Sequence, residues 1–221
     1  MGSLFFPFFI QVGSYTLILP KCVCRKMKKE FLELLLSTRR QGVDKVVDYL
    51  EKSGFFTAPA SVSKHLSRDG GLLEHSLNVC KVALMLREQM IAFKPDIESK
   101  VPKESVILSA LLHDVCKSSI YKKMQKFKKN AEGRWESYDG YDVDYSRFPF
   151  GHGEKSVVML LRLGLELTNE ELLAIRWHMA AWDLPFQSYE EKSNLSEASN
   201  VPLVSLVQAA DGLAAHLLES E

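Results

Sequence analysis

The sequence predicts an all-α domain that carries one small β-hairpin. Apolar residues recur every three to four positions along most of the chain, which is the period of an amphipathic helix that buries one face. Residues 127–147 lack this period, and the segment NAEG at 130–133 is typical of a turn between two strands. With 221 residues, of which 46% are hydrophobic, the chain is long enough for one substantial core. We therefore expect about seven helices around a single core.

The N-terminal half predicts four helices. A helical pattern runs over residues 26–52, where Gly42 divides it into two helices. Residues 71–93 predict one long amphipathic helix. Pro102 suits the first turn of the next helix, which we expect to run to about Lys117.

The C-terminal half begins after the hairpin. We expect, in order, a helix over 152–163, a helix over 168–181, a polar loop over 183–200 and a final helix over 202–218. Gly164 ends the first of these helices. Thr168 and Glu171 have the spacing of a capping box, in which each side chain satisfies a backbone N–H of the first turn of the second helix.

Charge and cysteine content restrict the class of protein. Lysine plus arginine and aspartate plus glutamate number 28 each, so no overall charge favours a nucleic acid or a membrane surface. The four cysteines form no CxxC pair, and we interpret them as reduced thiols of a cytoplasmic protein. No protein partner is indicated.

The first 26 residues differ from the rest, which we assign to a single domain over 27–221. The stretch LFFPFFIQVGSYTLILP is apolar, but it is short for a membrane-spanning helix and no basic segment precedes it as in a signal peptide. Two interpretations remain open. Residues 1–26 are either translated sequence upstream of a natural start at Met27 or a docking or membrane-attached segment.

Several polar residues occupy apolar faces of the expected helices. A carboxylate such as Asp211, flanked at helical spacing by Val204 and Val207, is too costly to bury without a cation or several donors. One such residue alone is more often a satisfied core residue. The six together form a mixed nitrogen and oxygen ligand set that suits two divalent ions, and they are His75, His113, Asp114, His152, His178 and Asp211.

The motifs around these residues resemble a known family. GGLLEHSLNV, LLHDVCK, GHGEKS, IRWHM and AADGLAA, in this order over about residues 60–218, look like the HD-domain superfamily of metal-dependent phosphohydrolases. The resemblance implies an all-helical fold whose ligands converge in one cleft. His75, His113, Asp114 and Asp211 match the H…HD…D signature, and His152 and His178 match the extra histidines of two-metal members. Asp114 is then the bridging carboxylate.

The resemblance also implies an activity, namely hydrolysis of a phosphate ester by a metal-activated water. The metals would be two divalent ions such as Mn, Fe, Zn, Ni or Mg, and the substrate a nucleotide, phosphomonoester or phosphodiester. Lys117 has the HDxxK position that suits a phosphate oxygen, although it could equally be a solvent-exposed helix end. Other expected substrate contacts are Lys155 with phosphate, His65 with the leaving group and Trp182 stacked on a base.

Other functions share the same ligands. Some relatives are di-iron oxygenases, which ligand identity alone does not distinguish from hydrolases. The GGLLEH stretch with His65 upstream is especially similar to 3′-to-5′ exoribonucleases, so short single-stranded nucleic acid is a second possible substrate. The lysine-rich run 122–129 could guide such a strand, although a solvated helix face is the commoner meaning of such a run. The complete ligand set argues against a non-catalytic binding module.

Overall fold

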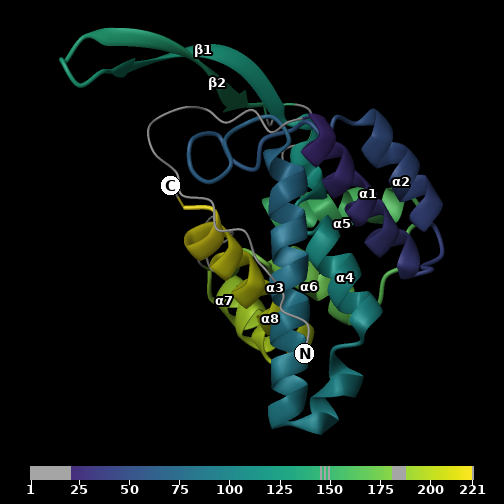
Figure 1. Cartoon of the computed structure of the whole chain (residues 1–221). Coiled ribbons are helices and arrows are strands. Elements are labelled where there is room, and N and C mark those ends of the chain that lie inside the picture. The colour runs from purple at the N-terminus through teal and green to yellow at the C-terminus, as the bar shows by residue number, and fades with distance from the viewer. Residues whose placement is uncertain (1–20, 145, 147, 149, 181–187, 221) are drawn as a thin grey trace, which may run out of the picture.

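The computed structural model describes residues 21–220 except 145, 147, 149 and 181–187, and its helices surround one long central helix (Figure 1). The all-α expectation with one small hairpin is confirmed. The elements are α1 (Lys21–Ser37), α2 (Val43–Lys52), α3 (Gly71–Phe93), the 3₁₀ helix η1 (Pro95–Lys100), α4 (Lys103–Leu112), the 3₁₀ helix η2 (Val115–Ser119), β1 (Tyr121–Lys129), β2 (Trp135–Val143), α5 (His152–Arg162), α6 (Asn169–Trp177), α7 (Tyr189–Ser199), α8 (Pro202–Leu213) and the π-helical turn η4 (Ala214–Leu218).

The core lies around α3, which packs against α4 on one side and α8 on the other. Val79 of α3, Leu108 of α4 and Val207 of α8 are fully buried in one apolar cluster. Burying an aliphatic side chain of this kind contributes about 1.5–3 kcal/mol. These three helices therefore form the centre of the core, and each of them also carries or adjoins one of the expected ligands.

The N-terminal helices follow the sequence prediction closely. Gly42 separates α1 from α2 with φ of 87°, and a Cβ at this position would overlap the backbone of Gly164. The helix expected over 71–93 is confirmed at both ends. α1 begins at Lys21, so the helix already extends into the segment assigned to the extension. Residues 1–20 lie outside the described part of the chain, and the status of 1–26 stays a prediction.

The helix that carries His113 is shorter than predicted. The α-helical conformation ends at Leu112, whereas we expected it to reach Lys117. His113 still has α-helical dihedrals, but Asp114 leaves them with φ of −103° and ψ of 17°, and the tighter 3₁₀ helix η2 follows. No Gly or Pro marks this break in the sequence. The change of winding places Asp114 at a junction between two elements.

The hairpin begins earlier than the predicted range of 127–147. β1 and β2 are antiparallel, in a register that pairs Tyr121 with Val143 and Lys129 with Trp135. The lysine run 122–129 therefore lies on a strand, and its interpretation as a helix face is wrong. Lysine is depleted in β-strands, and a run made mostly of lysine does not show the alternation of apolar and polar residues that identifies a strand. The hairpin extends away from the helices of the domain (Figure 1).

The C-terminal half confirms the helix over 152–163, which is α5, and corrects two other predictions. The capping box of Thr168 and Glu171 opens α6, but this helix ends at Trp177 and not near residue 181. The loop expected over 183–200 is wrong for residues 189–199, which form α7 behind a second capping box at Ser188. Ala198 is the one buried residue of α7, so the sequence shows no apolar stripe from which this helix could be predicted.

The final helix is confirmed over 202–218, although its last turn, η4, is π-helical. Among the described helices, none is by itself long and apolar enough to cross a membrane. α7 and the helix over 202–218 meet that criterion only as a pair bent by 97°.

Candidate metal centre

All six expected ligands converge at one place. They come from six separate elements or their ends: α3, the end of α4, the junction before η2, the start of α5, the end of α6, and α8. His75, His113, Asp114 and His178 are each at most 3% exposed. His152 and Asp211 are partly open, with side chains 19% and 13% exposed. The cluster is thus buried on one side and reachable on the other.

Asp114 lies at the centre and faces two pairs of histidines. Its Oδ1 accepts a hydrogen bond from His152 Nε2 at 2.5 Å and lies 3.4 Å from His178 Nε2. Its Oδ2 lies 3.4 Å from His113 Nε2 and 3.6 Å from His75 Nε2. Each carboxylate oxygen therefore serves a different pair of imidazoles, which is the arrangement that a carboxylate bridging two cations requires.

Asp211 completes one of the two halves. Its Oδ1 is 3.2 Å from His75 Nε2, and His75 Nε2 is 3.2 Å from His113 Nε2. The ligand atoms of these three residues lie within 4.8 Å of one another, and the same holds for His113, Asp114 and His178. The ligand atoms of His75, His113 and Asp211 are therefore close enough together to hold one ion.

The histidines are fixed so that Nε2 points into the centre. His113 and His178 each place Nδ1 2.8 Å from the backbone carbonyl three residues earlier, and His75 places Nδ1 2.9 Å from Glu219. A carbonyl only accepts, so Nδ1 of His113 and of His178 donates its proton to that carbonyl, and Nε2 is the nitrogen that faces the centre. The buried Nε2 of His178 has no hydrogen-bond partner among the described residues. Such second-sphere bonds are typical of metal-ligating histidines, and these residues fit a metal site.

The electrostatics of the cluster favour cations. Burial by itself lowers the pKa of His75, but hydrogen bonds to Asp211 and Glu219 raise it to about 9. Burial likewise opposes the charged form of His152, whose pKa rises to about 10 beside Cys116 and Asp114. Burial raises the pKa of Asp114, yet Lys117 and the neighbouring imidazoles hold it well below its usual range. The carboxylates therefore remain ionised and attract positive charge.

Lys117 joins the cluster and is not a solvent-exposed helix end. Its Nζ is 2.6 Å from Asp114 Oδ2, and its side chain is 13% exposed. His65 packs its ring against His75, with centroids 5.0 Å apart, and its buried Nε2 has no hydrogen-bond partner among the described residues. Lys155 is buried with its ammonium 5.6 Å from the centre of the Phe148 ring. Trp182 lies outside the described residues.

Two residues of the site were missed in the sequence. Glu219 is a buried carboxylate behind His75, beyond the expected end of the last helix. Cys116 is a buried free thiol whose Sγ is 3.4 Å from His152 Nδ1. A signal for Cys116 was available, because it lies between Asp114 and Lys117 in LLHDVCK. No pattern announced Glu219.

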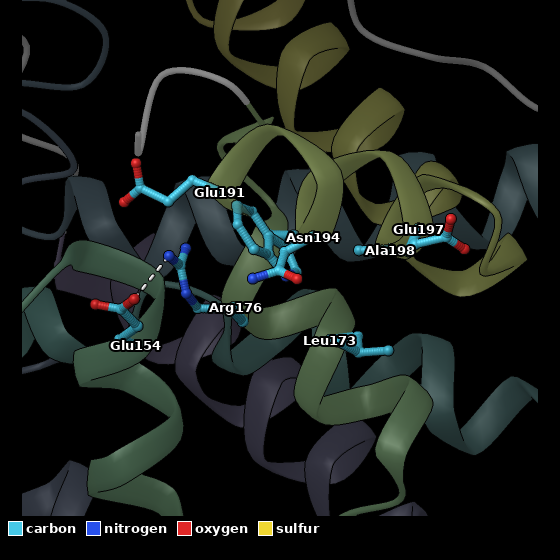
Figure 2. Close-up of a pocket in the computed structure, with 8 residues that line it drawn as sticks. Glu154, Leu173, Arg176, Glu191, Asn194, Glu197 and Ala198 are labelled. Atoms are coloured by element: carbon cyan, nitrogen blue, oxygen red, sulfur yellow. Dashed lines mark ion pairs between the residues drawn. The ribbon is translucent and has the colours of Figure 1, made fainter. Parts of the chain in front are cut away.

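Two cavities formed by the described residues are lined by none of the six ligands. One, of about 540 Å³, lies between α5, α6 and α7, where Arg176 pairs with Glu154 at 2.7 Å (Figure 2). The other, of about 440 Å³, lies at the base of the hairpin and is lined by Ser118 and Tyr121.

Comparison with known proteins gives the class. A family model, HD domain, matches residues 72–216, a stretch that contains all six converging residues. The chain belongs to the HD-domain family, in which a divalent metal site is expected. It is also similar to a dihydroneopterin 2′,3′-cyclic phosphate phosphodiesterase of Methanocaldococcus jannaschii, with 30% identity over 121 residues. That match covers 55% of this chain and 43% of the relative. No solved structure matches the chain.

Proposed function

We propose that this chain is a metal-dependent phosphohydrolase that cleaves a phosphate ester with a metal-activated water. The observation that carries the proposal is Asp114, whose two oxygens face separate pairs of imidazoles with their Nε2 atoms turned inward. His75, His113 and Asp211 would hold one divalent ion and His152 and His178 the other, with Asp114 shared. When bound, such a pair supplies a water with a pKa of about 7 and neutralises charge on the phosphoryl oxygens.

The chain's own cations and imidazoles would complete the reaction. Lys117 is held at Asp114 and can donate to a phosphate oxygen, which orients the ester at the centre. We propose His65 as the group that gives a proton to the leaving oxygen, because its ring packs against His75 and its Nε2 has no hydrogen-bond partner among the described residues. We further propose Lys155 and Trp182 as substrate contacts.

A small phosphorylated molecule is the substrate class that we propose. The relative's name specifies a 2′,3′-cyclic phosphate, and a cyclic phosphodiester is small enough for a partly buried centre. The cavity of about 440 Å³ beside Ser118 has the size of a small-ligand site. The free thiols of Cys24, Cys80 and Cys116 favour a cytoplasmic location.

The test is a substrate screen with protein loaded with Mn²⁺ and with protein treated with chelator. The panel comprises phosphomonoesters, 2′,3′-cyclic nucleotides and short single-stranded RNA. Asp114→Ala should abolish any turnover, whereas Asp142→Ala, which removes an exposed carboxylate of the hairpin, should not. Turnover that survives in Asp114→Ala or in the chelated protein would contradict the proposal.

Short single-stranded nucleic acid is a second candidate substrate, favoured by the hairpin. Phe127 and Trp135 are 65% and 68% exposed, and the strand register places both on one face. The Lys129 ammonium lies 5.4 Å from the Trp135 ring centre on that face. Exposed aromatics beside lysines suit stacked bases and phosphates. Trp135→Ala should then reduce cleavage of an oligonucleotide and leave a small ester unaffected; equal effects on both would reject this candidate.

A di-iron oxygenase is the rival reaction for the same ligand set. It is distinguished by the oxidant, because only the oxygenase consumes O₂. An iron-loaded sample that consumes O₂ and turns over no phosphate ester would replace the hydrolase proposal. Absence of O₂ consumption, together with hydrolysis by the Mn²⁺ form, would support it.

A further inference from the structure

We propose that Glu219 is a positioning residue that orients His75 and strengthens it as a metal ligand. This inference rests on the metal centre of the proposed function. Glu219 lies beyond residues 72–216, the stretch that matches the family model. The C-terminal end of the chain would thus contribute a functional residue that the shared motifs do not include.

The contact of Glu219 with His75 is close and buried. Its two carboxylate oxygens lie 2.9 and 3.2 Å from His75 Nδ1, and both side chains are 1% exposed. Asn78, one turn after His75 on α3, donates to the same carboxylate at 2.9 Å. Because an ionised carboxylate is costly to bury, this set of donors indicates that the position is built to hold its charge.

A local change of winding brings Glu219 to this place. After α8 the chain forms the π-helical turn η4, and the Glu219 N–H donates to the carbonyl of Ala214, five residues earlier, at 3.1 Å. A turn with one extra residue rotates Glu219 relative to an unbroken α-helix. Asp211 of the same helix lies 3.2 Å from the other nitrogen of His75. The imidazole is therefore held between two carboxylates of one helical segment, and π-turns often occur at functional sites.

The chemistry differs from that at the other histidines. His113 and His178 donate Nδ1–H to neutral backbone carbonyls, whereas His75 donates to a carboxylate. A carboxylate behind an imidazole fixes the tautomer and makes Nε2 a stronger donor to a metal, and its loss typically weakens metal affinity 10–100-fold. Glutamine at position 219 keeps the shape and an acceptor oxygen but removes the charge.

The experiment compares Glu219→Gln with Glu132→Gln, which removes a carboxylate from the exposed hairpin turn. We measure Mn²⁺ affinity by calorimetry and the absorption spectrum of the Co²⁺ form, together with the melting temperature of the chelated proteins. We expect Glu219→Gln to bind Mn²⁺ about 10–100-fold more weakly and to shift the Co²⁺ spectrum. The control should match the wild type in all three.

Affinity and spectrum separate this role from a structural one. A lower melting temperature with unchanged affinity and an unchanged Co²⁺ spectrum would mean that Glu219 only stabilises the fold, which overturns the proposal. If Glu219→Gln does not fold, we measure the Mn²⁺ affinity of Glu219→Asp, which keeps the charge but shortens the side chain by one methylene. Weaker Mn²⁺ binding by Glu219→Asp would support the proposal, and Mn²⁺ binding equal to that of the wild type would oppose it. These readouts need no substrate, so they remain decisive even if no phosphate ester is hydrolysed.

Discussion

Replacing Asp114 with alanine should remove both metals and nearly all activity. The carboxylate faces all four imidazoles of the centre, at 2.5 Å for His152 and 3.4–3.6 Å for the other three. Without it neither ion keeps its shared ligand, so the activated water is lost with the metals. Loss of several kcal/mol of transition-state stabilisation corresponds to a decrease of roughly a thousandfold or more in kcat/KM.

Lys117→Ala provides the contrast. An ammonium is not a metal ligand, so this variant should keep its metals while it loses one charge-assisted contact to phosphate. Such a contact is worth about 1.5–3 kcal/mol, which is roughly a 10- to 150-fold decrease in kcat/KM.

The metal-free Asp114→Ala protein should also be less stable than the metal-free wild type. Lys117 loses the carboxylate that lies 2.6 Å from its ammonium, and breaking a buried pair of this kind lowers the free energy of unfolding by about 3–5 kcal/mol.

The assay combines metal analysis of each purified variant with steady-state kinetics on the ester found in the screen, and with thermal unfolding of the chelated proteins. Asp142→Ala serves as the control for loss of an exposed carboxylate. Two equivalents of metal bound to Asp114→Ala with near-normal turnover would refute the bridging role. Loss of metal from Lys117→Ala would contradict the assignment of metal binding to Asp114 and of phosphate binding to Lys117.

Three further predictions concern protons, the N-terminus and one glycine. His75 and His152, whose pKa values are raised to about 9 and 10, carry protons at pH 7.5 in the metal-free protein. Metal binding should therefore release protons, and the metal affinity should increase as the pH rises toward 9. Calorimetry in buffers of different ionisation enthalpy counts the released protons, and binding without proton release would contradict the prediction. A chain that starts at Met27 should retain its fold and activity, whereas misfolding would show that the preceding segment is needed. Gly42→Ala should lower the free energy of unfolding by more than Gly133→Ala, because both glycines have positive φ but only the first would place a Cβ against backbone; equal thermal shifts would refute the clash.

The candidate site was predictable because its residues violate a simple pattern. His75 and Asp211 occupy apolar stripes of long, regular helices, where a polar side chain has no packing role. The helical period placed them correctly because α3 and α8 are buried against each other and their stripes are continuous. The helix faces therefore identified His75 and Asp211. The other four converging residues lie at the ends of elements, where the ordered motifs that resemble the HD-domain superfamily identified them.

The remaining features depend on contacts that one sequence does not display. α7 is exposed along nearly all its length, so it has no apolar stripe, and the capping box at Ser188 was its one local signal. The first strand of the hairpin is mostly lysine and is held by pairing with its partner strand. Glu219 is brought to His75 by the π-helical turn, which contains one more residue than an α-helical turn. No particular residue types identify such a turn in a sequence.

Anomalous diffraction from crystals of the Mn²⁺-loaded protein would show whether Asp114 joins two metal ions. We predict two peaks about 3.5–4 Å apart. His75, His113 and Asp211 should contact one peak, His152 and His178 the other, and Asp114 both. A single peak, or two peaks that Asp114 does not join, would contradict the account.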